Sequence, residues 1–458
     1  MKKLLLFSTS YDGVFSILAE ASKLHFSKKS KKAVQLKRIK KKLPSSNFYF
    51  FFIKLFFSGE IFSIRKFVFL KYHGFSVGRH VLSESRRFYQ SYKNPYIFFL
   101  IRCKILFSAG RIINTAIHLK DYADAILIDH AVYVNGLYLE VFYKYKKVIY
   151  SNGFPKGFFV IDATNKRGSS YLNTSSVFKV NAPYKISDYQ KKISFKKIKN
   201  NLINPKNITY MKKVTFKELD RKIDFSQVSH VVYAHSFTDA QLPYGTDGFS
   251  DTLDWLIFTI ENLVKLKTKI IIKGHPNFYN KNPNELSKVD KQIFQEIVNK
   301  FSDNKNLIFL NSSLKNFDLL NNIRKETILV THHGTLIFDA SILKNKVITS
   351  SQTFYDKKFK ITETWDNVNQ YKKLLKKNHK EIYMNYNKLL NIGHELYFNK
   401  YNTYGKNFYV KTILKYIKIR SDNMGSKKIS NDLQKLPYHK RKKLFYELEK
   451  KIEPLSFN

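Results

Sequence analysis

An apolar strand in the middle of the chain opens directly into a polar loop, with the sequence Lys269-Ile270-Ile271-Ile272-Lys273-Gly274-His275-Pro276-Asn277. A second strand, 327–330, opens in the same way into Thr331-His332-His333-Gly334-Thr335. In an open α/β sheet, ligands bind at the carboxyl ends of the strands. Two strand ends that carry lysine, imidazole and hydroxyl groups therefore predict a pocket for a phosphate-bearing ligand.

Strands and helices alternate on both sides of this stretch. In the C-terminal half the pattern begins with the strand 230–234 and predicts helices at 252–266, 288–301, 317–323 and 336–343, separated by strands at 269–272, 307–310, 327–330 and 346–349. In the N-terminal half it predicts strands at 4–7, 125–128 and 147–150, with helices at 14–24 and 96–119. Such alternation is typical of parallel sheets with crossover helices. The expected fold class is therefore α/β, with two Rossmann-like domains.

The length of 458 residues is too great for one ordinary domain. A polar stretch rich in Lys and Asn, 188–220, is the best candidate for a boundary. We therefore expect an N-terminal domain at 1–205, a second domain at 206–366, and a basic helical extension at 367–458.

The formal net charge of +46 predicts attraction to polyanions such as nucleic acid, anionic lipid or phosphorylated substrates. A mutational drift toward lysine on solvated faces explains part of the same excess, and both interpretations stay open. No apolar run reaches the ~20 residues that a spanning helix needs. The one cysteine, Cys103, cannot form an internal disulfide, and no Cys/His spacing resembles a zinc site. A cytoplasmic location is expected.

One basic region stands apart from this dispersed charge. No Asp or Glu occurs in the Lys-rich stretch 28–42, and the aromatic segment 48–57 follows closely as part of an insertion at about 28–72. Basic residues beside exposed aromatic residues suit an anionic membrane surface. The alternative is a basic loop followed by a buried helix. The first interpretation predicts a peripheral association with the cytoplasmic face of the inner membrane.

Each group at the two strand ends suits a phosphate in its own way. Lys273 and His275 can neutralise negative charge, and Pro276 fixes the backbone that follows. Gly334 permits close approach of the backbone to a ligand, and Asp339, one turn into the next helix, can accept a hydrogen bond from a ribose or sugar hydroxyl. The alternative makes His275 a hydrogen-bonded residue of a strand end and Thr331 a simple helix cap.

A third polar cluster follows the strand 230–234. It contains His235, Asp239, Asp247 and Asp251. Loops of this polar density commonly carry function. The three carboxylates resemble a cation site, but their spacing fits no calcium loop, so we expect no metal. Trp255, at helical spacing from Leu263, is expected in the core.

Together these motifs resemble the bacterial capsule polysaccharide biosynthesis family. The likeness is clearest over about 229–351, with a fainter one over Gly74–Arg86 and Asp129–Gly136. The segments that carry it are His235-Ser236-Phe237-Thr238-Asp239-Ala240, Asp247-Gly248-Phe249-Ser250-Asp251, Ile272-Lys273-Gly274-His275-Pro276-Asn277 and Thr331-His332-His333-Gly334-Thr335. Family members more often have Lys-Pro-His-Pro at Lys273–Pro276 and Glu at Asp339.

The resemblance implies a glycosyltransferase of the GT-B type, in which two Rossmann-like domains face a cleft. It implies a metal-independent, inverting transfer from a nucleotide-sugar donor, CMP-linked in better-known relatives, without a cofactor. Donor binding falls to Lys273, His275, Pro276, Thr331, His332, His333, Gly334, Thr335 and Asp339, and the other cleft residues are Asp12, His235, Asp239, Asp247 and Asp251. His275 also has a catalytic role, and the base that deprotonates the acceptor is expected among Asp129, His130 and, second to them, Asp12. Asp129 and Asp12 have the alternative role of helix caps.

The implied partners are the nucleotide-sugar donor, a glycan or glycolipid acceptor on a lipid carrier, and the anionic inner-membrane surface. Two other functions stay open. One is the transfer of a polyol phosphate from a donor such as CDP-glycerol, as in teichoic-acid synthesis. The other is nucleic-acid binding, which the charge favours but which the dispersed basic residues and the lack of a known binding module argue against.

Overall fold

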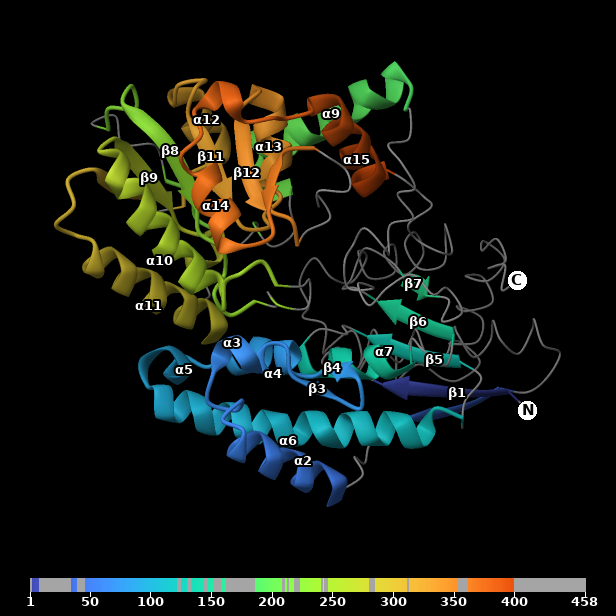
Figure 1. The fold of residues 1–458 in the computed structure, drawn as a ribbon. Coiled ribbons are helices and arrows are strands. Elements are labelled where there is room, and N and C mark those ends of the chain that lie inside the picture. The colour runs from blue at the N-terminus through green and yellow to red at the C-terminus, as the bar shows by residue number, and fades with distance from the viewer. Residues whose placement is uncertain are drawn as a thin grey trace. The chain divides into compact units, whose positions relative to one another are not determined.

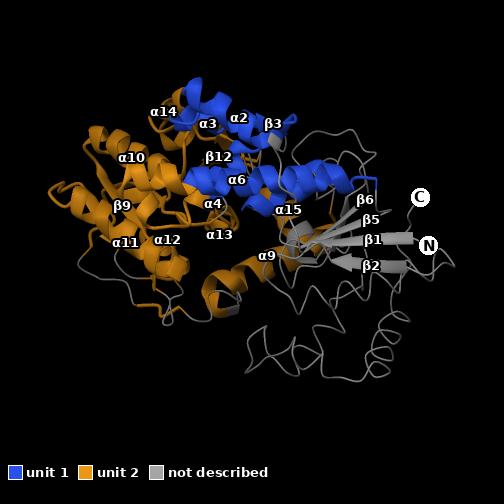
Figure 2. Ribbon diagram, turned by 90° about the horizontal axis from the view of Figure 1, so that it is seen from below, with its two compact units in different colours: residues 1–84, 102–171, 400–458 blue, residues 85–101, 172–399 orange. Residues whose placement is uncertain are grey.

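The computed structural model describes residues 2–7, 34–38, 46–121, 125–129, 133–142, 147–151, 158–161, 186–207, 211, 214–217, 223–239, 242, 246–279, 285–310, 313–352 and 361–398. The chain forms two compact units, shown in separate colours in Figure 2. The first contains residues 1–84, 102–171 and 400–458, and the second contains residues 85–101 and 172–399.

The second unit is built on a six-stranded parallel sheet. Its spatial order is β10-β9-β8-β11-β12-β13. The strands are β8 (Val228–Tyr233), β9 (Lys269–Lys273), β10 (Leu307–Leu310), β11 (Ile328–Thr331), β12 (Lys346–Ser350) and β13 (Glu363–Trp365). Numbered from β8, this is the order 3-2-1-4-5-6 of the Rossmann fold, which binds ligands where the strand order reverses. The reversal lies between β8 and β11, as Figure 1 shows.

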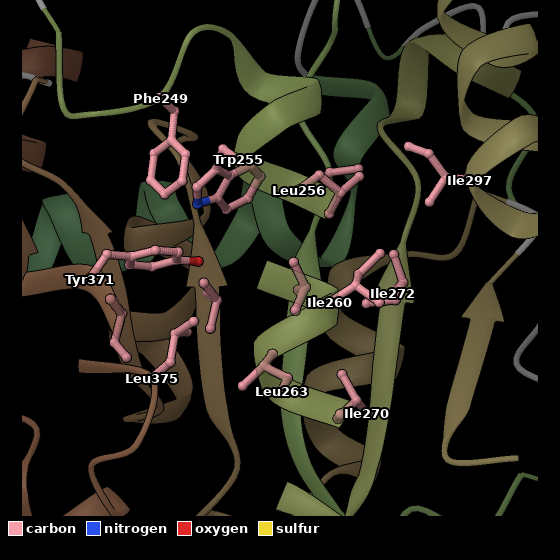
Figure 3. Packing of buried hydrophobic residues seen from close by; sticks show 14 of the residues in the cluster. Phe249, Trp255, Leu256, Ile260, Leu263, Ile270, Ile272, Ile297, Tyr371 and Leu375 are labelled. Atoms are coloured by element: carbon pink, nitrogen blue, oxygen red, sulfur yellow. The ribbon is translucent and has the colours of Figure 1, made fainter. Parts of the chain in front are cut away.

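Helices cover both faces of this sheet because its strands are apolar on both sides. Successive residues of β9 alternate between two cores: Ile271 belongs to one, and Ile270 and Ile272 belong to the other. The first core also takes residues from α9 (Asp188–Ile203), α12 (Asn316–Asn322), α13 (Leu336–Leu343) and α15 (Tyr386–Phe398). The second, drawn in Figure 3, takes residues from α10 (Thr252–Leu263), α11 (Glu285–Lys300) and α14 (Val368–Leu374). Trp255 is fully buried there, which confirms its expected place in the core.

The second unit begins earlier and ends later than composition suggested. Residues 188–203, within the stretch proposed as a boundary, form α9, which starts at a capping box on Ser187. Ile198 and Leu202 of α9 are buried in the core, although most of the helix is Lys, Asn and other polar residues. Beyond residue 366, α14 and α15 also pack on the sheet. A few buried apolar residues therefore assign these basic helices to the unit.

The first unit contains a five-stranded sheet in the order β2-β1-β5-β6-β7. The strands are β1 (Lys2–Phe7), β2 (Val34–Arg38), β5 (Ala125–Asp129), β6 (Lys147–Ser151) and β7 (Phe158–Ile161). Pairing is parallel except between β6 and β7. The order reverses between β1 and β5, so Asp129, the last residue of β5, lies at a strand end next to this reversal.

Helices and one small hairpin complete the first unit and its link to the second. They are α2 (Ser46–Phe57), α3 (Ile64–Phe67), α4 (Gly78–Ser85), α5 (Gln90–Lys93), α6 (Pro95–Leu119) and α7 (Gly136–Phe142), with the hairpin β3 (Lys71–Tyr72) and β4 (Phe75–Ser76). Short 3-10 turns are η1 (Tyr133–Asn135), η2 (Pro205–Asn207), η5 (Val264–Leu266), η6 (Pro276–Tyr279) and η7 (His379–Glu381). Within the described ranges, no helix combines the length and the apolar character that a membrane crossing requires.

Candidate functional site

Three strand ends meet at the reversal point of the second sheet. β8 pairs with both β9 and β11, so the residues that follow these strands are neighbours. His235 follows β8, His275 follows β9, and His333 follows β11. The ring centroids of His235 and His333 are 3.8 Å apart, and those of His235 and His275 are 5.7 Å apart. The structure thus brings together the two strand ends singled out from the sequence and His235 of the third polar cluster.

The three imidazoles are uncharged at neutral pH. Burial, together with the neighbouring His235 and Lys273, lowers the pKa of His275 to about 3. Burial and the neighbouring histidines lower the pKa of His333 well below its ordinary value, and burial also lowers that of His235. These side chains therefore act in the unliganded protein as neutral hydrogen-bonding groups.

Backbone contacts fix which nitrogen carries the proton in two of these rings. The Asn277 backbone N–H donates to Nδ1 of His275 at 3.3 Å, so neutral His275 holds its proton on Nε2. Nδ1 of His235 lies 3.1 Å from the Ser236 carbonyl oxygen, which can only accept, so His235 holds its proton on Nδ1. The remaining nitrogens therefore differ: Nε2 of His275 is a donor, and Nε2 of His235 is an acceptor.

Lys273 is a buried cation at the end of β9. Its side chain is only 2% exposed, and no carboxylate of the described residues lies within 4 Å of its Nζ. Burial lowers the pKa of Lys273 to about 8, against a smaller opposing effect of Asp339. Its Nζ lies 5.5 Å from the centroid of the Tyr233 ring, which is neutral. Because a buried charge without an ion pair is costly, this position suits the anionic group of a ligand.

Asp339, on the first turn of α13, provides an acceptor beside this cation. Its Oδ2 accepts a hydrogen bond of 2.7 Å from the side-chain amide of Asn316. Burial raises the pKa of Asp339 to about 6, and the hydrogen bond and Lys273 reduce that rise. The Tyr233 hydroxyl, also buried, has no hydrogen-bond partner in the part of the chain that the structure describes. The carboxylate is held in place and keeps a second oxygen for a hydroxyl group.

A chain of hydrogen bonds links Asp247 to His333 through His332. Oδ2 of Asp247 accepts from Nε2 of His332 at 2.8 Å and from the Ser350 hydroxyl at 2.6 Å. Burial alone would raise the pKa of Asp247, but these two donors lower it below its ordinary value. Nδ1 of His332 lies 2.6 Å from Nδ1 of His333, so one ring donates and the other accepts. One added proton on this pair would change Nε2 of His333 from an acceptor to a donor.

The loop after β8 is anchored by Asp290, a residue that the sequence interpretation missed. Its carboxylate accepts from the Ser236 hydroxyl at 2.6 Å and from the backbone N–H groups of Phe237 and Thr238 at 2.9 and 3.0 Å. Burial raises the pKa of Asp290 to about 6, in opposition to these hydrogen bonds. The signal was present, since Asp290 extends the buried stripe of α11 that contains Ile293, Phe294 and Ile297. An acid on the apolar side of a helix calls for buried donors.

Glycines in both motifs allow close packing. A Cβ on Gly274 would lie 2.5 Å from the Tyr279 hydroxyl, which donates to the Leu310 carbonyl at 3.1 Å. Glycine at this position thus lets Tyr279 connect the ends of β9 and β10, while Pro276 begins η6. A Cβ on Gly334 would lie 3.0 Å from Oγ1 of Thr331. Thr331 is the last residue of β11, so it is not a helix cap; Thr335 precedes α13 and makes no side-chain capping bond.

The other predicted residues lie in different surroundings. Asp251 caps α10 through the Asp254 backbone N–H at 2.8 Å and pairs with Arg86 at 2.8 Å, so both oxygens have protein partners. Asp239 is exposed after β8. Asp129 ends β5 in the first unit, while Asp12 and His130 lie outside the described residues. Within the described ranges, no group of His, Cys, Asp and Glu side chains is arranged to hold a metal ion.

Comparison with known proteins gives only distant structural likenesses. No family model and no curated protein matches the chain. Thermosulfurimonas dismutans KpsC, a beta Kdo 2,4 transferase, is 10% identical, with a TM-score of 0.34 over 51% of this chain and 71% of its own. Methanocaldococcus jannaschii UDP-GlcNAc 2-epimerase, in complex with UDP-GlcNAc and UDP, is 13% identical, with a TM-score of 0.28 over 87% of this chain and 100% of its own.

A third similar structure is Anabaena HepE in complex with UDP and glucose. It is 9% identical, with a TM-score of 0.24 over 95% of this chain and 98% of its own. Because each of these TM-scores lies below 0.5, the likeness carries no inference about activity. The function has to be derived from the chain's own residues.

Proposed function

We propose that this protein is a glycosyltransferase of surface polysaccharide assembly that takes its sugar from a nucleotide-activated donor. The observation that carries the proposal is the buried Lys273 ammonium, which lies with three neutral histidines at the reversal point of a Rossmann-type sheet. Among the residues that the structure describes, no carboxylate lies within 4 Å of it. A phosphate placed there would supply the missing negative charge. Asp339 would accept a hydrogen bond from a sugar or ribose hydroxyl of the same ligand.

In the proposed reaction, this site stabilises the leaving group. An acceptor hydroxyl attacks the anomeric carbon, and the bond from that carbon to the donor phosphate oxygen breaks with both electrons remaining on oxygen. Negative charge then builds on the phosphate, where Lys273 and the Nε2–H of His275 can stabilise it without a metal. Removing one such preorganised donor typically costs about 100- to 1000-fold in turnover.

The pair His332 and His333 can respond to this change in charge. In the neutral state, Nε2 of His332 donates to Asp247, and the two Nδ1 atoms share one proton. A proton taken up from solvent with the donor would leave Nε2 of His333 able to donate to a phosphate oxygen. The negative charge of the phosphate would oppose the burial and the neighbouring histidines that lower the pKa of His333. We assign this pair the role of charge compensation at the leaving phosphate.

The proton of the acceptor hydroxyl needs a base, for which we propose Asp129. It ends β5 beside the reversal point of the first sheet, the usual place for functional residues in such sheets. The acceptor would be a glycan or a lipid-linked glycan, and attack from the face opposite the phosphate would invert the anomeric carbon. Asp129→Asn should abolish transfer while leaving nucleotide binding unchanged.

Nucleotide binding to the purified full-length protein is the decisive measurement. Calorimetry and thermal shift against CMP, CDP, UDP and GDP should show saturable binding of one of them. We expect His275→Ala to remain folded and to lose most of that binding, whereas His118→Ala, an exposed histidine in α6, should bind as the wild type does. Full nucleotide binding in folded His275→Ala would contradict the site.

The products formed from a donor that carries the bound nucleotide then distinguish two reactions. A new glycosidic linkage with release of the nucleotide supports the transferase. Transfer of a polyol phosphate from CDP-glycerol would assign the same phosphate site to a phosphotransferase instead.

A further inference from the structure

The α2 helix is apolar around its whole circumference. Its sequence is Ser-Asn-Phe-Tyr-Phe-Phe-Phe-Ile-Lys-Leu-Phe-Phe. One side packs within the first unit: the ring of Phe48 lies 5.0 Å from that of Tyr72 and 5.6 Å from that of Phe107 in α6, and Leu55 is 4% exposed. Figure 1 shows α2 alongside α6. A helix that is apolar all round normally has a second apolar environment on its other side.

That other side is a row of exposed apolar residues. Phe50 is 73% exposed and Phe57 is 82% exposed, with Ile53 between them at 49%. These three residues follow the spacing i, i+3, i+7, which places them on one face of the helix. Tyr49 and Phe56 lie beside them, at 58% and 47%. Folded chains rarely leave so many adjacent large apolar side chains in water unless a partner covers them.

Exposed basic residues occur within this row and in the segments that follow it in the chain. Lys54 lies within it, Arg65 and Lys66 are exposed on α3, and Lys71 is exposed on β3. Between Glu20 and Glu60 the sequence contains no acid, while 28–42 alone holds nine Lys and Arg residues: Lys28, Lys29, Lys31, Lys32, Lys37, Arg38, Lys40, Lys41 and Lys42. An apolar and anionic partner would complement both the exposed row and the basic residues of this part of the chain.

We propose that the outer face of α2 inserts into the headgroup region of an anionic lipid bilayer. Phe, Ile and Tyr side chains would enter the boundary between headgroups and acyl chains, while Lys54, Arg65 and Lys66 contact lipid phosphates. Duplex nucleic acid fits this face less well, because its bases are paired and stacked, so Phe50, Ile53 and Phe57 would meet a charged backbone and no apolar surface. The inference is independent of the nucleotide site, since none of its residues belongs to that site.

Vesicle co-sedimentation of the full-length protein tests the proposal. Binding is expected to phosphatidylcholine vesicles that contain phosphatidylglycerol, and to weaken strongly with added salt and on phosphatidylcholine alone. Phe50→Ser with Phe57→Ser should lower the partition coefficient at least about tenfold. Arg65→Ser with Lys66→Ser should lower it about 25-fold, at about fivefold for each cation near the surface.

Tyr189→Ser with Leu266→Ser removes two exposed apolar side chains from the second unit and should leave vesicle binding unchanged. Each variant is also tested for nucleotide binding, so a loss of vesicle binding with nucleotide binding retained separates this surface from the proposed function. Three results would overturn the proposal. They are wild-type protein that ignores anionic vesicles, Phe50/Phe57 variants that bind them as well as wild type, and a face that binds duplex DNA in preference to lipid. If the wild type does not bind vesicles and the Phe50/Phe57 variant has a much lower melting temperature, another segment of this chain covers α2 instead.

Discussion

Each unit buries a cluster of polar side chains that includes histidine, and the two clusters differ in how their charges are paired. In the first unit, Nδ1 of His80 lies 2.6 Å from the Tyr133 carbonyl oxygen, and its Nε2 lies 3.4 Å from Oε1 of Glu140. Arg79 donates to the same carboxylate. In the second unit, His235, His275 and His333 pack against one another and beside the cationic Lys273. The first cluster contains an ion pair, whereas in the second no carboxylate of the described residues lies within 4 Å of the Lys273 ammonium.

The pKa shifts follow from this difference. Burial alone would raise the pKa of Glu140, but His80 and Arg79 lower it below its ordinary value. In the second cluster, burial and neighbouring positive groups lower the pKa of every histidine for which a shift is resolved. A buried polar cluster whose charges are paired holds the fold together, whereas one whose cation lacks an ion pair leaves a place for an anionic ligand.

Breaking the first cluster should give the largest loss of stability. Glu140→Ala leaves Arg79 and His80 buried without their acceptor, which typically costs about 3–5 kcal/mol. The matched control is Glu261→Ala, which breaks the exposed ion pair with Lys300 and should cost less than about 1 kcal/mol. Urea unfolding of both variants measures the difference. Equal losses would show that the His80 cluster is not a structural centre.

Removing Asp290, which anchors the loop after β8, should give the second-largest loss of stability. Asp290→Ala leaves the backbone N–H groups of Phe237 and Thr238 without their buried acceptor, and about 3 kcal/mol of stability should be lost. Because the same loop positions His235, nucleotide binding should weaken as well. Asp303→Ala, an exposed residue after α11, serves as the control for stability. A stable variant with normal binding would remove Asp290 from any positioning role.

The strand ends were predictable because their signals are local. A run of Ile or Val followed by Gly, His and Pro fixes both the end of a strand and the chemistry there, and β9, β10, β11, α13 and β12 were predicted within a residue or two. A parallel sheet was likewise expected from alternation alone, although its sixth strand, β13, was not predicted. Periodicity and turn residues are properties of a short window, so the sequence displays them directly.

What the sequence did not show depends on contacts between distant segments. Asp290 lies more than 50 residues from the loop that it anchors. Asp251 was predicted to line the cleft, because the sequence does not show its ion pair with Arg86. The polar composition of α9 concealed its place in the core, because Ile198 and Leu202 suffice to bury one side. Such pairings follow from the tertiary fold, which local patterns do not encode.

Removing the charge of the second cluster should have the opposite effect to Glu140→Ala. Lys273→Met eliminates a buried ammonium that has no ion pair, so the unliganded protein should be as stable as the wild type or more stable. Nucleotide affinity should fall about 30-fold, or about 2 kcal/mol, because a charge-assisted contact to phosphate is lost. Lys269→Met, at the other end of β9, should bind normally. A destabilised Lys273→Met protein with wild-type affinity would mean that Lys273 is structural.

Nucleotide affinity should also depend on pH through Lys273, and this effect should be the smallest of those predicted. With a pKa of about 8, Lys273 is mostly protonated at pH 7 and mostly neutral at pH 9, and only the protonated form attracts phosphate. Affinity should therefore fall about tenfold from pH 7 to pH 9. The histidines cannot cause this fall, because the pKa of His275 is about 3 and that of His333 is also far below the range. Calorimetry of Lys273→Met at both pH values should give the same affinity. If the affinity of that variant still falls between pH 7 and pH 9, a group other than Lys273 binds the phosphate.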